Sequence, residues 1–92
     1  MRMNECNARI ADDVLAAIAD LETGSVTVAD VQATLQSALS RFENDGSCVA
    51  DAVRLAEADL EEIQFTMLLD EQIPTAIFRL DELRSAVDDA DG

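Results

Sequence analysis

The sequence predicts a small all-α protein, an antiparallel four-helix bundle built from two helical hairpins. Apolar residues recur at spacings of three and four along most of the 92-residue chain. Residues typical of helix ends separate four such segments, and no segment shows sustained β-strand alternation. We therefore expect a single helical domain, residues 1–92, with helices at about 5–22, 28–44, 48–70 and 73–89.

The first helix carries an apolar stripe at helical spacing, formed by Ala11, Val14, Ile18 and Leu21. Three aspartates fall on its opposite face. Gly24 follows where helices commonly end in left-handed backbone, which a glycine adopts without strain. This helix should therefore end just before Gly24.

The second helix has the most complete start signal in the chain. Thr27 is placed to cap the helix, and Asp30 can return a hydrogen bond to the cap amide, as in a capping box. Val26 and Val31 occupy the two positions of a hydrophobic staple. Residues 44–46, Asn-Asp-Gly, are expected to end this helix.

The last two helices are separated by a break whose position depends on proline. Ser47 is expected to cap the third helix, which has an apolar stripe from Val53 to Met67. Pro74 is costly inside a helix, so we place the break at about 70–73 and Pro74 in the first turn of the fourth helix. The alternative is one long helix kinked at Pro74. The stripe of the fourth helix comprises Ile73, either Ala76 or Ile77, Leu80, Leu83 and Val87.

The chain is strongly acidic, with 20 Asp and Glu residues, six arginines, no lysine and a net charge of −14. Such a surface repels itself at ordinary salt, but at 1 M salt the Debye length is only about 3 Å. With its abundant Asp, Ala, Val and Thr, the chain resembles the small acidic, lysine-free proteins of haloarchaea. An acidic protein from a GC-rich mesophile is the alternative. We expect a cytoplasmic protein, since no secretory signal and no membrane-spanning run is found.

Several functional classes lack the residues that they require. Direct binding to nucleic acid or to an anionic membrane needs clustered cationic side chains, but the arginines are scattered among carboxylates. The chain has no histidine, and Cys6 and Cys48 are 42 positions apart. Zinc sites, di-iron sites and nucleophilic triads are therefore disfavoured, and we expect no cofactor, metal or catalytic residue.

An acidic flank of the third helix leaves one enzymatic alternative open. Glu57, Glu61 and Glu62, with Asp59 nearby, could hold a divalent cation. The Glu61–Glu62 pair resembles part of the Glu-Glu-x-x-Glu motif of MazG-type nucleotide pyrophosphohydrolases, although Phe65 stands at the position of the third glutamate. A small divalent-metal-dependent hydrolase is thus the runner-up function.

Apolar side chains in excess of one stripe per helix predict an interface. Phe65, Leu68 and Leu69 lie beside the stripe of the third helix, and Phe78 follows the Pro74 break. One neighbouring hairpin does not readily cover them all. We therefore expect a non-enzymatic interaction module that forms a homodimer or binds another protein through these four side chains.

One segment resembles a known family. Residues 14–42, which include the turn Leu21-Glu22-Thr23-Gly24-Ser25-Val26-Thr27-Val28, are similar to the helical hairpin of the exonuclease VII small subunit. That resemblance implies an accessory subunit of a larger enzyme, without catalytic residues of its own. The helix end at Gly46 and the two further helices depart from that family.

The charge predicts that the fold depends on salt. Lowering KCl from about 2 M to about 0.1 M restores repulsion among the carboxylates, so the melting temperature and the cooperativity of unfolding should fall. Circular dichroism melts at the two concentrations measure this change. An equal or higher melting temperature at low salt would remove the argument for adaptation to high salt.

Overall fold

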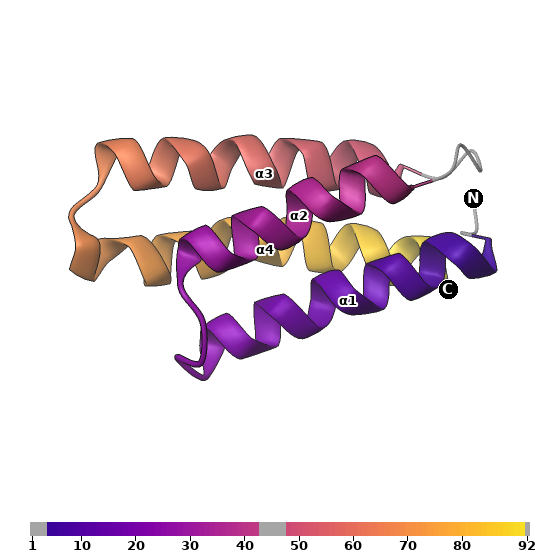
Figure 1. The fold of residues 1–92 in the computed structure, drawn as a ribbon, viewed down its shortest axis with the longest axis horizontal. Coiled ribbons are helices and arrows are strands. Elements are labelled where there is room, and N and C mark those ends of the chain that lie inside the picture. Colours follow the sequence, from indigo (N-terminus) through magenta and orange to yellow (C-terminus); the bar gives the residue numbers. More distant parts are fainter. Residues whose placement is uncertain (1–3, 43–47, 92) are drawn as a thin grey trace.

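The computed structural model describes residues 4–42 and 48–91, and these residues form four helices and no strand (Figure 1). Helix α1 is Glu5–Glu22, α2 is Val28–Arg41, α3 is Val49–Thr66 and α4 is Leu69–Asp91. Successive helices run in opposite directions, so α1–α2 and α3–α4 are two hairpins (Figure 1). The predicted all-α bundle of two hairpins is confirmed.

Each helix contributes one apolar stripe to a shared core. Helix α3 packs between α2 and α4, and α1 packs against both α2 and α4. The stripes predicted for α1 and for the main body of α3 and α4 are buried. The largest fully buried side chains include Ile18, Leu21, Leu35, Leu60, Leu80 and Leu83.

The turn between α1 and α2 has the predicted glycine at its helix end. Gly24 has a φ of +79° and follows the C-cap residue Thr23. Its N–H donates to Leu21 O at 3.1 Å, and Ser25 N–H donates to Asp20 O at 2.9 Å. These two bonds form a Schellman motif, which satisfies carbonyls at the helix end. A Cβ added at position 24 would meet no atom within 4 Å. A side chain there would be strained only because residues other than glycine rarely adopt this positive φ.

The predicted capping box at the start of α2 is also present. Asp30 N–H donates to the Thr27 hydroxyl oxygen at 3.1 Å, and Thr27 N–H donates to Asp30 Oδ2 at 2.9 Å. Val31 is fully buried, and Val26 is partly buried and packs against the core. The start of α2 is therefore held by two hydrogen bonds and an apolar contact, as the sequence indicates.

The capping box also affects the ionisation of Asp30. The hydrogen bond from the Thr27 backbone N–H, together with the Thr27 side chain, lowers the pKa of the Asp30 carboxyl below its ordinary value of 3.8. A lowered pKa in the folded state means that the ionised carboxylate stabilises the fold above that value. This contribution is lost as the pH falls through the lowered pKa.

The break between α3 and α4 lies earlier than predicted. Helix α3 ends at Thr66, Met67 has extended backbone, and α4 begins at Leu69. The predicted break at 70–73 is therefore wrong, and so is the alternative of one long kinked helix. Pro74 is the sixth residue of α4 and not part of its first turn.

The observed break is explained by charge and by local hydrogen bonds. Asp70 and Glu71 fall in the first turn of α4, where carboxylates interact favourably with the positive end of the helix dipole. Glu71 N–H donates to Leu68 O at 2.9 Å, and Gln72 Nε2 donates to Met67 O at 3.2 Å. Pro74 lies close enough to this helix start to be tolerated, since it removes only one intrahelical hydrogen bond.

The remaining helix ends differ slightly from the prediction. Helix α2 ends at Arg41 with Phe42 as its C-cap, short of residue 44. Cys48 occupies the N-cap position of α3 and makes no side-chain capping bond. The predicted cap Ser47 and the predicted stop at 44–46 lie outside the described residues.

Removal of the α2 cap should destabilise the protein. Thr27→Ala deletes the hydroxyl that accepts from Asp30 N–H, so the free energy of unfolding should fall by about 1 kcal/mol. Thr34→Ala is the matched control within α2, since Thr34 only donates to a helix carbonyl, that of Asp30. Denaturant unfolding at constant high salt compares them, and equal effects of the two changes would argue against a capping role.

Candidate interaction surface

The large apolar side chains that remain exposed in the described residues all belong to the α3–α4 hairpin. They lie on α3, on α4 or in the turn between them, whereas α1 and α2 have none. Six residues form this set: Leu55, Phe65, Leu68, Leu69, Ile73 and Phe78. Contiguous exposed apolar patches mark interaction sites, so the α3–α4 hairpin is the candidate interaction surface.

The two hairpins end at different positions along the bundle. The α3–α4 turn extends beyond the α1–α2 turn along the long axis of the molecule (Figure 1). Helices α3 and α4 have 18 and 23 residues, whereas α2 has 14. The last turn of α3 and the first turns of α4 therefore project past the first hairpin. We call this projecting part, residues 64–73, the overhang.

The core-facing stripe of α4 continues into the overhang. Ala76 and Leu80 are fully buried. Ile73 lies three residues before Ala76, and Leu69 lies four residues before Ile73, so both continue the same helical stripe. Yet Ile73 is 39% exposed and Leu69 is 82% exposed. These two side chains thus lie on the face of α4 that is buried elsewhere, at a level that α1 and α2 do not reach.

A pocket of about 530 Å³ lies in the step between the overhang and the α1–α2 turn. Leu69, Gln72 and Ile73 line one side of this pocket, and residues 26–29 line the other. None of its nine described lining residues is charged, although 28% of the chain is Asp, Glu or Arg. The volume falls within the range of about 300–1,000 Å³ that is typical of binding pockets.

The four predicted interface residues are all exposed, but they do not share one surface. Phe65 is 83% exposed, Leu68 70% and Leu69 82%, and all three fall within the overhang, but Phe65 lies two residues from the buried Ile63 and so faces outward from α3. Phe78 is 72% exposed and lies farther along α4, two residues from both Ala76 and Leu80, on the outward face. The sequence analysis missed Ile73 as an exposed residue, because its place in the stripe predicted burial.

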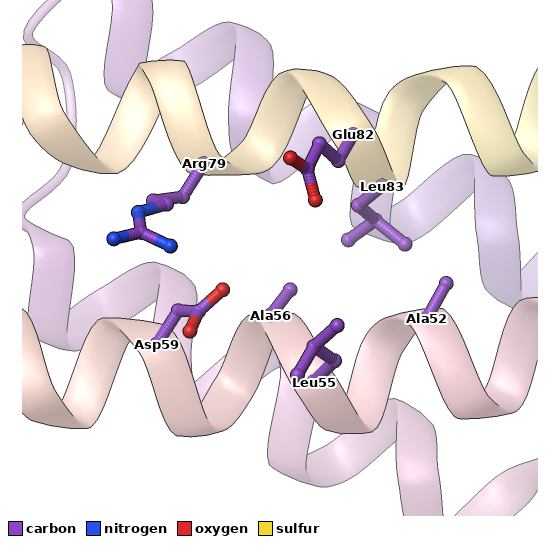
Figure 2. Close-up of a pocket in the computed structure, with 7 residues that line it drawn as sticks. All are labelled: Ala52, Leu55, Ala56, Asp59, Arg79, Glu82 and Leu83. Carbon is purple, nitrogen blue, oxygen red and sulfur yellow. The ribbon is translucent and has the colours of Figure 1, made fainter.

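A second, smaller hollow lies between α3 and α4. Figure 2 shows Arg79 and Glu82 of α4 facing Asp59 and Leu55 of α3 across it. Arg79 forms no ion pair with any described residue, whereas the other described arginines each pair with a carboxylate. The hollow measures only about 130 Å³, below the usual range of ligand pockets. It is therefore a small hollow lined by both apolar and charged residues.

The acidic residues of α3 point in different directions. Glu57 faces α2, where its Oε1 accepts hydrogen bonds from Gln36 Nε2 at 2.9 Å and Gln32 Nε2 at 3.1 Å. Asp59 faces α4, and Glu61 and Glu62 are exposed. No three potential metal ligands come together within the described residues. This arrangement gives no support to the hydrolase alternative, because a divalent cation needs several oxygens around one point.

Comparisons with protein-family models, with curated proteins and with solved structures found no significant match for this chain. Within residues 4–42 and 48–91, no helix combines the length and apolar character needed to cross a bilayer. The functional argument therefore rests on the geometry of the exposed surface.

The contacts of Glu57 predict that this residue is structural. Glu57→Gln replaces a carboxylate that accepts two interhelical hydrogen bonds, so the free energy of unfolding should fall by about 1 kcal/mol. Glu61→Gln is the matched control, since Glu61 is exposed on the same helix, and it should have a smaller effect. Thermal melts measure both, with Mg²⁺ compared against KCl of equal ionic strength. A stabilisation by Mg²⁺ that Glu57→Gln abolishes would instead favour the hydrolase.

Proposed function

We propose that this protein is a non-enzymatic helical assembly module that forms a homodimer through its overhang, in a cytoplasm of high salt. The observation that carries the proposal is the exposure of Leu69 and Ile73 in the lining of an uncharged pocket, with Phe65 and Leu68 also exposed on the overhang. The acidic, lysine-free composition supports the high-salt setting.

The energetics favour association of moderate strength. Burial of these four side chains from each of two copies contributes on the order of 10 kcal/mol. Association costs about 4–15 kcal/mol in lost translational and rotational freedom. The two terms are similar in size, and even the lower cost leaves a net of only about −6 kcal/mol, which corresponds to a dissociation constant of tens of micromolar. The dimer should therefore respond to conditions that alter either apolar or electrostatic interactions.

Salt acts on both interactions in the same direction. Two copies of charge −14 repel each other, and this repulsion is largely screened at about 1 M salt. Salting-out ions also strengthen apolar association. The absence of charged side chains from the described lining of the pocket supports a contact at this place, because no carboxylate there has to lose its water.

A change at Leu69 should test the proposed dimer. The unmutated protein at tens of micromolar in about 2 M KCl should sediment as a dimer that weakens as salt is lowered. Leu69→Asp places a carboxylate in the contact and should yield monomer. Leu55→Asp is the control, because Leu55 is 60% exposed on α3 but lies outside the overhang.

Each result of this experiment has a definite meaning. A dimer that Leu69→Asp dissociates and Leu55→Asp leaves intact supports the proposal. A monomer for the unmutated protein would contradict homodimerisation. A dimer that survives Leu69→Asp would show that the overhang is not the contact.

A further inference from the structure

We infer that the two copies interlock, with the overhang of each lying in the step of the other, so that Leu69 and Ile73 pack against the same residues of the second copy. This inference rests on the proposed homodimer and specifies its contact. The pocket beside the α1–α2 turn is then the recess that receives the second overhang.

The first support is the continuity of the α4 stripe. Along the main body of α4, stripe residues such as Ala76 and Leu80 are buried by three neighbouring helices. The α3–α4 turn extends past the end of the α1–α2 hairpin (Figure 1), and in this part Ile73 and Leu69 remain 39% and 82% exposed. A second overhang brings two more helical segments with the same stripe. Four segments then surround Leu69 and Ile73, as in the rest of the bundle.

The second support is the shape of the end of the bundle. A two-fold symmetric contact uses the same patch on both copies, so that patch must be complementary to itself. The patch here contains a projection, the overhang, directly beside a recess, the step at residues 26–29 (Figure 1). The proposed contact is related by half a turn, with the projection of each copy in the recess of the other. A single type of contact thus covers both.

The third support is that the polar groups in the pocket already have partners within the chain. Gln72 Nε2 donates to Met67 O at 3.2 Å, and Gln64 Nε2 donates to Leu60 O at 3.1 Å. The hydroxyl oxygen of Thr27 accepts from Asp30 N–H. Each of these amide nitrogens therefore already donates at least one hydrogen bond within the chain, which lowers the cost of covering it.

The position of the carboxylates agrees with this contact. Glu61, Glu62 and Asp70 are exposed near the overhang but do not line the pocket. They can remain hydrated at the edge of the contact while its centre is apolar. An uncharged centre with a charged, hydrated rim is the arrangement typical of protein interfaces.

Cysteine cross-linking tests the interlock. Cys6 and Cys48, which are exposed and unbridged, are first replaced by serine. Ile73→Cys should then form covalent dimers under mild oxidation about tenfold faster than Phe78→Cys. A disulfide requires its two Cα atoms to lie within about 7 Å, and the interlock brings residue 73 of the two copies close together but not residue 78. Phe78 is the matched control, since it lies on α4 but faces outward and is 72% exposed.

Amide hydrogen exchange on the unmutated protein gives a second measurement that does not depend on any variant. Raising the protein concentration should slow exchange at residues 24–29 and 67–73, which the interlock covers. Exchange at residues 52–59, beside the smaller α3–α4 hollow, should not change. This measurement remains decisive if a cysteine variant fails to fold or to associate.

The outcomes separate the interlock from the homodimer itself. Fast cross-linking at Ile73→Cys with slowed exchange at both predicted segments supports the interlock. A dimer that cross-links faster through Phe78→Cys, or that slows exchange only at 52–59, overturns the interlock but leaves the homodimer standing. A monomer in sedimentation, without concentration-dependent exchange, overturns both. Slowed exchange on addition of a small apolar probe to a monomer would instead make the pocket a ligand site.

Discussion

Burial of one apolar stripe from each helix is the interaction on which the rest of this structure depends. Ile18, Leu35, Leu60 and Leu80, one from each helix, are completely buried at the centre of the bundle. Ordering a chain of 92 residues costs about 1.5 kcal/mol per residue, which nearly cancels what a core of this size contributes. In such a small domain the net stability is therefore narrow, and any further apolar burial has a large relative effect.

Repulsion within the strongly negative chain lowers this small free energy of unfolding further. Ion pairs in the described residues involve surface side chains, and only Arg41–Asp13 and Arg84–Glu22 link different helices. Exposed pairs of this kind contribute at most about 1 kcal/mol each. They cannot offset the repulsion that a net charge of −14 produces, so ions of the surrounding salt must screen most of this repulsion. Salting-out ions also strengthen apolar contacts, so the proposed assembly should respond to salt in the same direction as the fold.

The unequal length of the two hairpins connects the fold to the proposed assembly. A longer α1–α2 hairpin would cover Leu69 and Ile73 and would leave a closed bundle. The shorter one exposes a continuation of the core at one end, without charged residues in the described lining of the adjoining pocket. A second copy offers the same stripe and the same step, and this is why a symmetric contact can complete what a single chain leaves open.

The sequence alone determined the four helices, their stripes and the α1–α2 turn, because Gly24, Thr27 and Asp30 act through contacts only a few residues apart. It also identified Phe65, Leu68 and Leu69 as apolar residues beyond one stripe. It misplaced the break near Pro74, because α4 begins at Leu69 and continues through this proline, which therefore does not mark the start of the helix. The outward direction of Phe78 follows from its place two residues from Ala76 and Leu80 in the helix. Only the tertiary structure decided that Ile73 is uncovered, because its exposure depends on where the other hairpin ends, which no local pattern within α4 shows.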